Sequence, residues 1–177
     1  MKALAICGSP RKGNTEAMLK RVLDGAKSKG AGIELIRLID KNILECDGCS
    51  GCEGTKSCRI SDEMPQIYAK VMDADALVLG SPNYFNNVSS LMKKFIDRMN
   101  PYWQDKRLQG KKVALVMPGG YSKESIEKGM RAFEEFPRIC KMQVVGKIGE
   151  VLENPNEARS NEKLMKQCFE LGEKLAG

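Results

Sequence analysis

The sequence has 177 residues, is 42% hydrophobic and carries a formal net charge of +6, which fits one domain with an adequate core. No stretch approaches the roughly 20 apolar residues of a membrane helix, and residues 8–10 break the first apolar run too early for a signal peptide, so we expect a cytoplasmic protein without a membrane partner. The absence of histidine excludes imidazole catalysis and metal ligation, and basic residues scattered among acidic ones argue against a nucleic-acid partner.

Short apolar runs alternate with longer amphipathic segments along the chain. Five runs predict strands, at 3–6, 33–38, 76–79, 113–117 and 144–148. Five segments predict helices, at 15–29, 62–72, 88–99, 122–136 and 157–175. The alternation predicts an α/β fold with a parallel sheet covered by helices on both faces. We expect a single domain over residues 1–177, with one cysteine-rich insert at 43–61.

The loop after the first predicted strand places small and polar residues directly before a helix. Free backbone N–H groups and the helix dipole make such a junction an anion site. Ser9 and Thr15 add hydroxyl groups, Asn14 adds an amide and Arg11 adds positive charge. These four residues are the candidate ligands of a phosphate group.

Three kinds of phosphate site require different residues at this junction. A nucleoside-triphosphate loop needs a lysine where this sequence has Asn14, and a dinucleotide fingerprint needs Gly-x-Gly-x-x-Gly, which is absent. A single terminal phosphate, as in FMN, needs only the hydroxyls and amides that are present. The alternative is an ordinary strand-to-helix turn without a ligand.

Two stretches together resemble the NADPH-dependent FMN reductase and flavodoxin-like family: this first loop, and residues 80–89 with the sequence GSPNYFNNVS. The resemblance implies a flavodoxin-like doubly wound five-stranded parallel sheet, order 2-1-3-4-5, that binds FMN. It implies that Ser9, Arg11, Asn14 and Thr15 hold the phosphate. It also implies that the isoalloxazine is lined by Pro82, Asn83, Tyr84 and Phe85. From the residues alone, Phe85 could equally belong to the core.

The loop after the fourth predicted strand contains Gly119 and Gly120. It resembles a Gly-Gly loop that family members place against the flavin, although it departs from the longer common form. A plain turn before a helix is the alternative. Asn86 and Asn87 stand where relatives often have glycine, and since asparagine tolerates the left-handed region, we expect the turn to survive.

Four of the seven cysteines lie close together in the insert, in the pattern C-x2-C-x2-C-x5-C: Cys46, Cys49, Cys52 and Cys58. Three cysteines spaced by two residues can surround the corners of one [4Fe-4S] cluster, and a fourth can close it. Structural zinc, which prefers two cysteine pairs set far apart, is one alternative. A disulfide or free thiols are the other.

The cysteine spacing is similar to that of the iron–sulfur flavoproteins, a branch of the same family. In that branch the motif also lies between the second strand and the second helix, and it carries a [4Fe-4S] cluster. The resemblance implies a ferredoxin-like electron donor and a small-molecule acceptor such as a quinone, oxygen or peroxide. It also implies a homodimer or homotetramer.

Three functional hypotheses follow from these patterns. In the first, the chain is an FMN-dependent oxidoreductase that passes electrons from a low-potential donor through a [4Fe-4S] cluster and FMN to an acceptor. In the second, NAD(P)H is the substrate that reduces FMN directly, as in an FMN or quinone reductase, and the cysteines hold no cluster. The third is a non-enzymatic flavin carrier or a zinc-stapled sensor. The chemistry in the first two belongs to the flavin, so no catalytic side chain is predicted.

Overall fold

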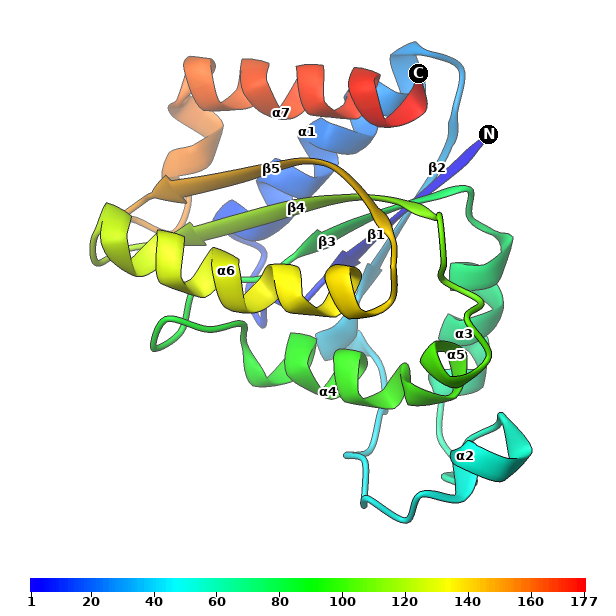
Figure 1. Ribbon diagram of the computed structural model, residues 1–177. Helices are drawn as coiled ribbons and strands as arrows, with labels where there is room; N and C mark the ends of the chain where they lie inside the picture. The colour runs from blue at the N-terminus through cyan, green and yellow to red at the C-terminus, as the bar shows by residue number, and fades with distance from the viewer.

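A five-stranded parallel sheet in the order β2-β1-β3-β4-β5 forms the centre of the computed structural model, which describes all 177 residues (Figure 1). Its strands are β1 (Lys2–Cys7), β2 (Gly32–Arg37), β3 (Ala76–Gly80), β4 (Lys112–Gly119) and β5 (Gln143–Val151). The central strands are buried almost throughout, because helices cover both of their faces. The predicted α/β fold and strand order are confirmed.

The helices form two layers, one on each face of the sheet (Figure 1). One layer pairs α1 (Asn14–Ser28) with α7 (Glu162–Ala176). Glycines make their close contact possible, since a Cβ at Gly25 would collide with the carbonyl oxygen of Phe169. The other layer consists of α3 (Met64–Asp73), α4 (Ser90–Arg98) and α6 (Lys123–Ile139). None of the helices combines the length and hydrophobicity needed to cross a membrane.

Two helix ends lie three or more residues from the positions expected from the sequence. The helix predicted at 157–175 is divided into a 3₁₀ turn (Glu157–Ser160) and α7, because the Asn161 side chain accepts a hydrogen bond from the Leu164 amide at 3.0 Å and caps a new start. The helix predicted to stop at 136 continues through Pro137 to Ile139.

Three short elements were absent from the prediction. A 3₁₀ turn (Leu38–Asp40) follows β2, α2 (Gly51–Thr55) lies inside the cysteine-rich insert, and α5 (Asn100–Gln104) follows α4 directly. In Figure 1 the insert extends from the lower end of the molecule, with α2 at its tip. Helices of this length are decided by tertiary context rather than by periodicity.

Backbone hydrogen bonds continue the sheet beyond the strands and draw the connecting loops together. The Gly8 amide donates to the Gly80 carbonyl at 2.8 Å, and the Asn83 amide donates to the Pro118 carbonyl at 2.8 Å. The loops after β1, β3 and β4 therefore meet at the carboxyl edge of the sheet. This edge is where doubly wound folds bind ligands.

Candidate functional site

The first helix begins with backbone N–H groups that no side chain caps. Its N-cap residue is Gly13, and no side-chain hydrogen bond closes this end. Ser9 and Thr15 are buried at the same junction, whereas Arg11 is exposed. The Ser9 hydroxyl accepts a hydrogen bond from the Arg11 amide at 3.2 Å and donates to the Arg11 carbonyl at 3.0 Å, which folds the loop back on itself. The junction thus offers free donors and the positive end of the helix dipole to an anion.

The only carboxylate in the first turn of this helix, that of Glu16, is buried and paired. The Glu16 side chain is 3% exposed, and its Oε2 lies 3.0 Å from Nε of Arg37 while its Oε1 lies 2.7 Å from Nζ of Lys20. Two cations therefore balance its charge. Burial raises the pKa of the Cys7 thiol at the end of β1, which keeps that group neutral. No uncompensated negative charge opposes a phosphate here.

The Asn14 side chain is already used inside the protein. Its Nδ2 donates to the Asn154 carbonyl at 2.7 Å, and its Oδ1 accepts from the Ala158 amide at 3.0 Å. These bonds hold the 154–158 segment beside the loop, where a Cβ at Gly13 would come within 2.7 Å of the Pro155 carbonyl oxygen. The role predicted for Asn14 as a phosphate ligand stays a prediction, and its side chain has a structural role as well.

The loop after β3 carries an exposed aromatic turn. Tyr84 and Asn87 pair across it, with N···O distances of 2.9 and 3.0 Å, and Phe85 and Asn86 between them have φ values of 51° and 59°. Positive φ at both central residues defines a type I′ turn, which asparagine accepts readily and phenylalanine rarely does. Phe85 is fully exposed and Tyr84 is 41% exposed. The alternative that Phe85 belongs to the core is wrong.

The neighbouring residues Pro82 and Asn83 fix this loop to β4 and α6. Pro82 is buried and Asn83 half-buried. Asn83 Nδ2 donates to Ser125 Oγ at 2.8 Å, and that hydroxyl donates to Asn86 Oδ1 at 2.6 Å. The Asn83 side chain therefore supports the turn from beneath, and its buried Oδ1 lacks a hydrogen-bond partner.

The loop after β4 brings Gly119 and Gly120 to the same edge. A Cβ on Gly119 would lie 2.8 Å from Cβ of Asn83 and 2.7 Å from Cδ1 of Ile126, so the close approach of the two loops requires glycine. Gly120 is exposed. The next residue, Tyr121, is 88% exposed and was missed from the sequence, although an aromatic residue beside a Gly-Gly turn was a usable signal. Exposed aromatic residues on adjacent loops suit the face of a planar ring.

Two buried serines that the sequence analysis passed over connect these loops. Ser89 Oγ donates to the Gly8 carbonyl at 2.6 Å and accepts from the Met92 amide at 3.2 Å, so it caps α4 and holds the first loop. Ser81 Oγ accepts from the Ser89 amide at 2.8 Å. The sequence analysis placed Ser89 inside a helix at 88–99, whereas α4 begins at Ser90 with Ser89 as its N-cap. Nothing local indicated the bond of Ser89 to a residue 81 positions away.

The cysteine-rich insert is closed at its base by a buried ion pair. The side chains of Arg98 and Asp62 are 1% and 0% exposed, and Nη1 of the arginine lies 2.5 Å from Oδ2 of the aspartate. Asp62 also accepts from the amides of Leu44 and Met64, each at 2.9 Å. Arg98 Nη1 donates to the Leu44 carbonyl at 2.8 Å. One pair of side chains therefore joins the beginning of the insert, its end and helix α4.

The charge on this pair is set by competition between burial and hydrogen bonding. Burial acts to raise the pKa of Asp62, but the Arg98 guanidinium and two backbone amides outweigh it, and the pKa is lowered overall. Burial acts to lower the pKa of Arg98, and the Asp62 carboxylate more than reverses this effect. Both groups are therefore ionised at neutral pH, and the charge of each one offsets the cost of burying the other.

The four insert cysteines line one small cavity of about 70 Å³. Cys46 and Cys49 are exposed, and Cys52 and Cys58 are half-buried. No three cysteine, aspartate or glutamate side chains converge closely enough to form a metal site. All seven cysteines are free thiols, so the disulfide alternative finds no support. The structure thus brings the predicted ligands to one cavity without gathering their sulfur atoms at coordination distance.

Comparison with known proteins decides the family. The model of the family described as NADPH-dependent FMN reductase matches residues 1–157. The chain belongs to this family. An iron–sulfur flavoprotein of Methanocaldococcus jannaschii is 35% identical over 147 residues, which are 82% of this chain and 76% of that protein. An iron–sulfur flavoprotein of Methanosarcina thermophila is 30% identical over 162 residues, 89% of this chain and 85% of that protein.

A solved archaeal flavodoxin shares the fold, with a TM-score of 0.69 at 23% identity, over 99% of this chain and 96% of that chain. The flavodoxin-like fold is therefore confirmed. Membership in the FMN reductase family makes the chain an FMN-dependent oxidoreductase.

Proposed function

We propose that this member of the FMN reductase family passes electrons through FMN. The FMN would receive these electrons from a [4Fe-4S] cluster held by Cys46, Cys49, Cys52 and Cys58. The observation that carries the flavin part is the uncapped start of α1 beside the exposed aromatic loops. The FMN phosphate would lie at the free N–H groups, with Ser9, Thr15 and Arg11 around it. Tyr84, Phe85 and the Gly119–Gly120 loop would face the ring.

Bound FMN supplies one- or two-electron transfer and can accept a hydride. The protein contributes position and environment. The buried Ser89 and the half-buried Asn83 hold the loops after β1 and β3 in place through their hydrogen bonds. The paired Glu16 leaves the phosphate end free of uncompensated negative charge. These features support a preformed flavin site, which lowers the entropic cost of binding.

Support for the cluster comes from the donor set and from its surroundings. Four cysteines line one cavity, and Asn100 Nδ2 donates to Cys52 Sγ at 3.0 Å. Soft thiolate ligands surrounded by N–H donors suit an iron–sulfur cluster. Such a cluster supplies one-electron transfer at low potential, which fits a ferredoxin-like donor. A small-molecule acceptor, a homodimer or homotetramer, and a cytoplasmic location complete the proposal.

The second candidate is direct reduction of FMN by NAD(P)H without a cluster. The family description names NADPH, and the sulfur atoms are not gathered at coordination distance. In this case the insert would be a surface feature with free thiols. The two candidates share the flavin site and differ only in the source of electrons.

Anaerobic purification followed by iron, acid-labile sulfide and flavin assays tests the proposal. We expect about four irons and four sulfides for each FMN, a broad visible absorbance that reduction bleaches, and slow NADPH oxidation. Flavin without iron, together with rapid NADPH oxidation, would establish the second candidate. Protein that takes up no flavin would contradict both.

A further inference from the structure

The junction between α4 and α5 forms the inner wall of the cysteine cavity. Arg98 ends α4 and Asn100 begins α5, and both line the cavity together with the four cysteines. Both residues carry side-chain N–H donors and no negative charge. Asp97 and Pro101 of the same junction also line the cavity, so Arg98 and Asn100 are the side-chain N–H donors on a wall that is otherwise acidic and apolar.

Asn100 already uses one donor on a sulfur atom. Its Nδ2 lies 3.0 Å from Sγ of Cys52, and both residues are half-buried. A thiolate accepts such a bond more strongly than a thiol, because the acceptor is then charged. The amide is therefore oriented for a metal-bound Cys52 in the present fold.

Arg98 holds an unused donor in the same place. Its Nη atoms bind Asp62 and the Leu44 carbonyl, but its Nε is buried and has no hydrogen-bond partner. Leaving a charged donor unpaired in the interior is costly. Arg98 and Cys58 line the same small cavity. A thiolate sulfur at the cavity wall is the acceptor that this guanidinium lacks.

We infer that Asn100 and Arg98 set the reduction potential of the cluster by donating hydrogen bonds to the sulfur atoms of Cys52 and Cys58. The inference rests on the proposed function, because it requires the cluster. Reduction adds one negative charge to the cluster, so N–H donors and a nearby cation stabilise the reduced form more than the oxidised one. The two residues therefore make the cluster easier to reduce.

The decisive experiment compares Asn100→Ala with Gln104→Ala. Gln104 is an amide of similar exposure on the same short helix that does not line the cavity. Each protein is purified anaerobically, its iron is counted, and the midpoint potentials of cluster and flavin are measured by spectroelectrochemical titration. We expect Asn100→Ala to keep about four irons per chain and to shift the cluster midpoint to a more negative value. The flavin midpoint and both midpoints of Gln104→Ala should not move.

Arg98→Lys is the second variant. It keeps the positive charge beside Asp62 and removes Nε and the forked guanidinium, and we expect a negative shift in the cluster midpoint alone. Circular dichroism shows whether it folds, and the Asn100 variant decides the question if it does not. An Asn100→Ala protein with full iron and an unchanged cluster midpoint would overturn the inference, as would a folded Asn100→Ala protein that loses its iron. Absence of iron in the parent protein would instead overturn the proposed function, and this inference with it.

Discussion

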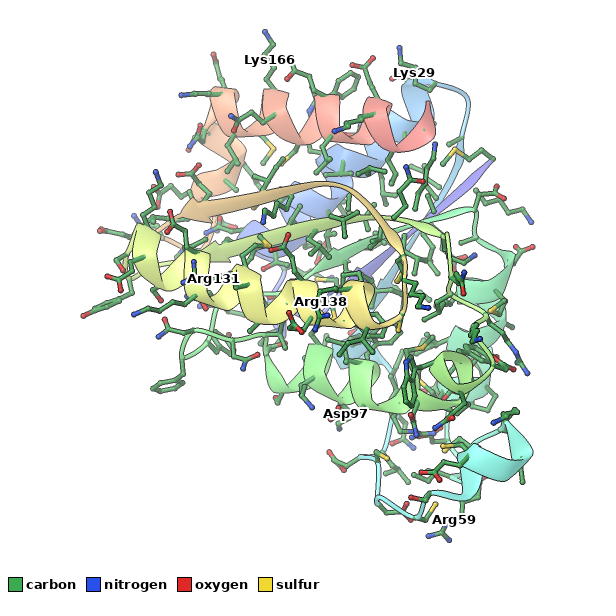
Figure 2. All side chains as sticks on the ribbon, viewed as in Figure 1. Lys29, Arg59, Asp97, Arg131, Arg138 and Lys166 are labelled. Atoms are coloured by element: carbon green, nitrogen blue, oxygen red, sulfur yellow. The ribbon has the colours of Figure 1, made fainter.

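The carboxyl edge of the sheet, where we propose that FMN binds and which we call the flavin edge, and the cysteine insert are held in opposite ways. At the flavin edge, backbone hydrogen bonds extend the sheet into the loops, and buried serines connect one loop to the next. The insert is held by a few side-chain contacts, chiefly the buried Arg98–Asp62 pair at its base and the Asn100–Cys52 hydrogen bond, while Cys46 and Cys49 remain exposed. In Figure 2 the labelled Arg59 lies at the outer end of the insert and points away from the sheet. The fold itself builds the first site, whereas a bound group would have to complete the second.

The largest expected effect comes from opening the base of the insert. Asp62→Ala removes the partner of a buried arginine and two acceptor bonds, and breaking such a pair costs about 3–5 kcal/mol. We expect this loss in the free energy of unfolding, measured by urea denaturation. Asp47→Ala removes an exposed partner of Arg59 in the same insert and should cause no measurable change. Equal losses of unfolding free energy in the two variants would mean that the Arg98–Asp62 pair does not stabilise the insert more than an exposed pair does.

The next effect concerns the flavin edge alone. Thr15→Val removes a buried hydroxyl at the start of α1 with little change in volume. A hydrogen bond to a charged group contributes about 1.5–3 kcal/mol, so FMN affinity should fall roughly 10- to 150-fold, measured by fluorescence titration of the apoprotein. Thr55→Val in α2 of the insert is the matched control. Unchanged FMN affinity in Thr15→Val would remove this residue from the phosphate site.

A smaller effect on stability is expected from adding a methyl group at the flavin edge, and none from adding one in the insert. Gly8→Ala places a Cβ 2.7 Å from Cβ of Met92, and such overpacking costs about 1–3 kcal/mol. Gly54→Ala in the insert meets no atom within 4 Å and should leave stability unchanged or slightly higher. Thermal unfolding of both variants checks this difference. A destabilised Gly54→Ala protein would show that the insert is packed more tightly than its contacts indicate.

The smallest expected effect is a pH-dependent decrease in the stability difference between the parent protein and Asp62→Asn. The pKa of Asp62 is lowered in the folded protein, so its stabilising contribution is complete above the unfolded-chain value of about 3.9. It is lost as the pH falls through the lower folded value. We expect the stability difference between the parent and Asp62→Asn to shrink below about pH 4, measured by urea denaturation at several pH values. The difference between the parent and Gly8→Ala should stay constant over the same range.

The sequence was sufficient for the sheet and for the loops that meet at its carboxyl edge, because apolar runs of strand length and small residues before helices are local signals. Other features depend on contacts between residues far apart in the chain. Asp62 and Arg98 are 36 positions apart, and no spacing rule relates them. The positive φ of Phe85 contradicts its intrinsic preference, so only the pairing of Tyr84 with Asn87 explains it.

The cysteine motif likewise combines features that the local sequence predicts with features that depend on distant contacts. The structure places Cys46, Cys49, Cys52 and Cys58 around one cavity, and their role as cluster ligands stays a prediction. The spacing could not show that Asn100, 48 positions beyond Cys52, supplies a hydrogen bond to the motif. The donors around this candidate site come from the tertiary fold, whereas its candidate ligands follow from the local sequence.

The link from Asn14 to the 154–158 segment has a consequence for how the protein is made. The first loop to leave the ribosome obtains its Asn154 and Ala158 partners only after about 140 further residues have been synthesised. Until then the nascent chain presents an unfinished pocket. At the proposed site, flavin loading would therefore be a late event in biosynthesis, and a chain stalled on the ribosome before residue 158 would bind FMN weakly.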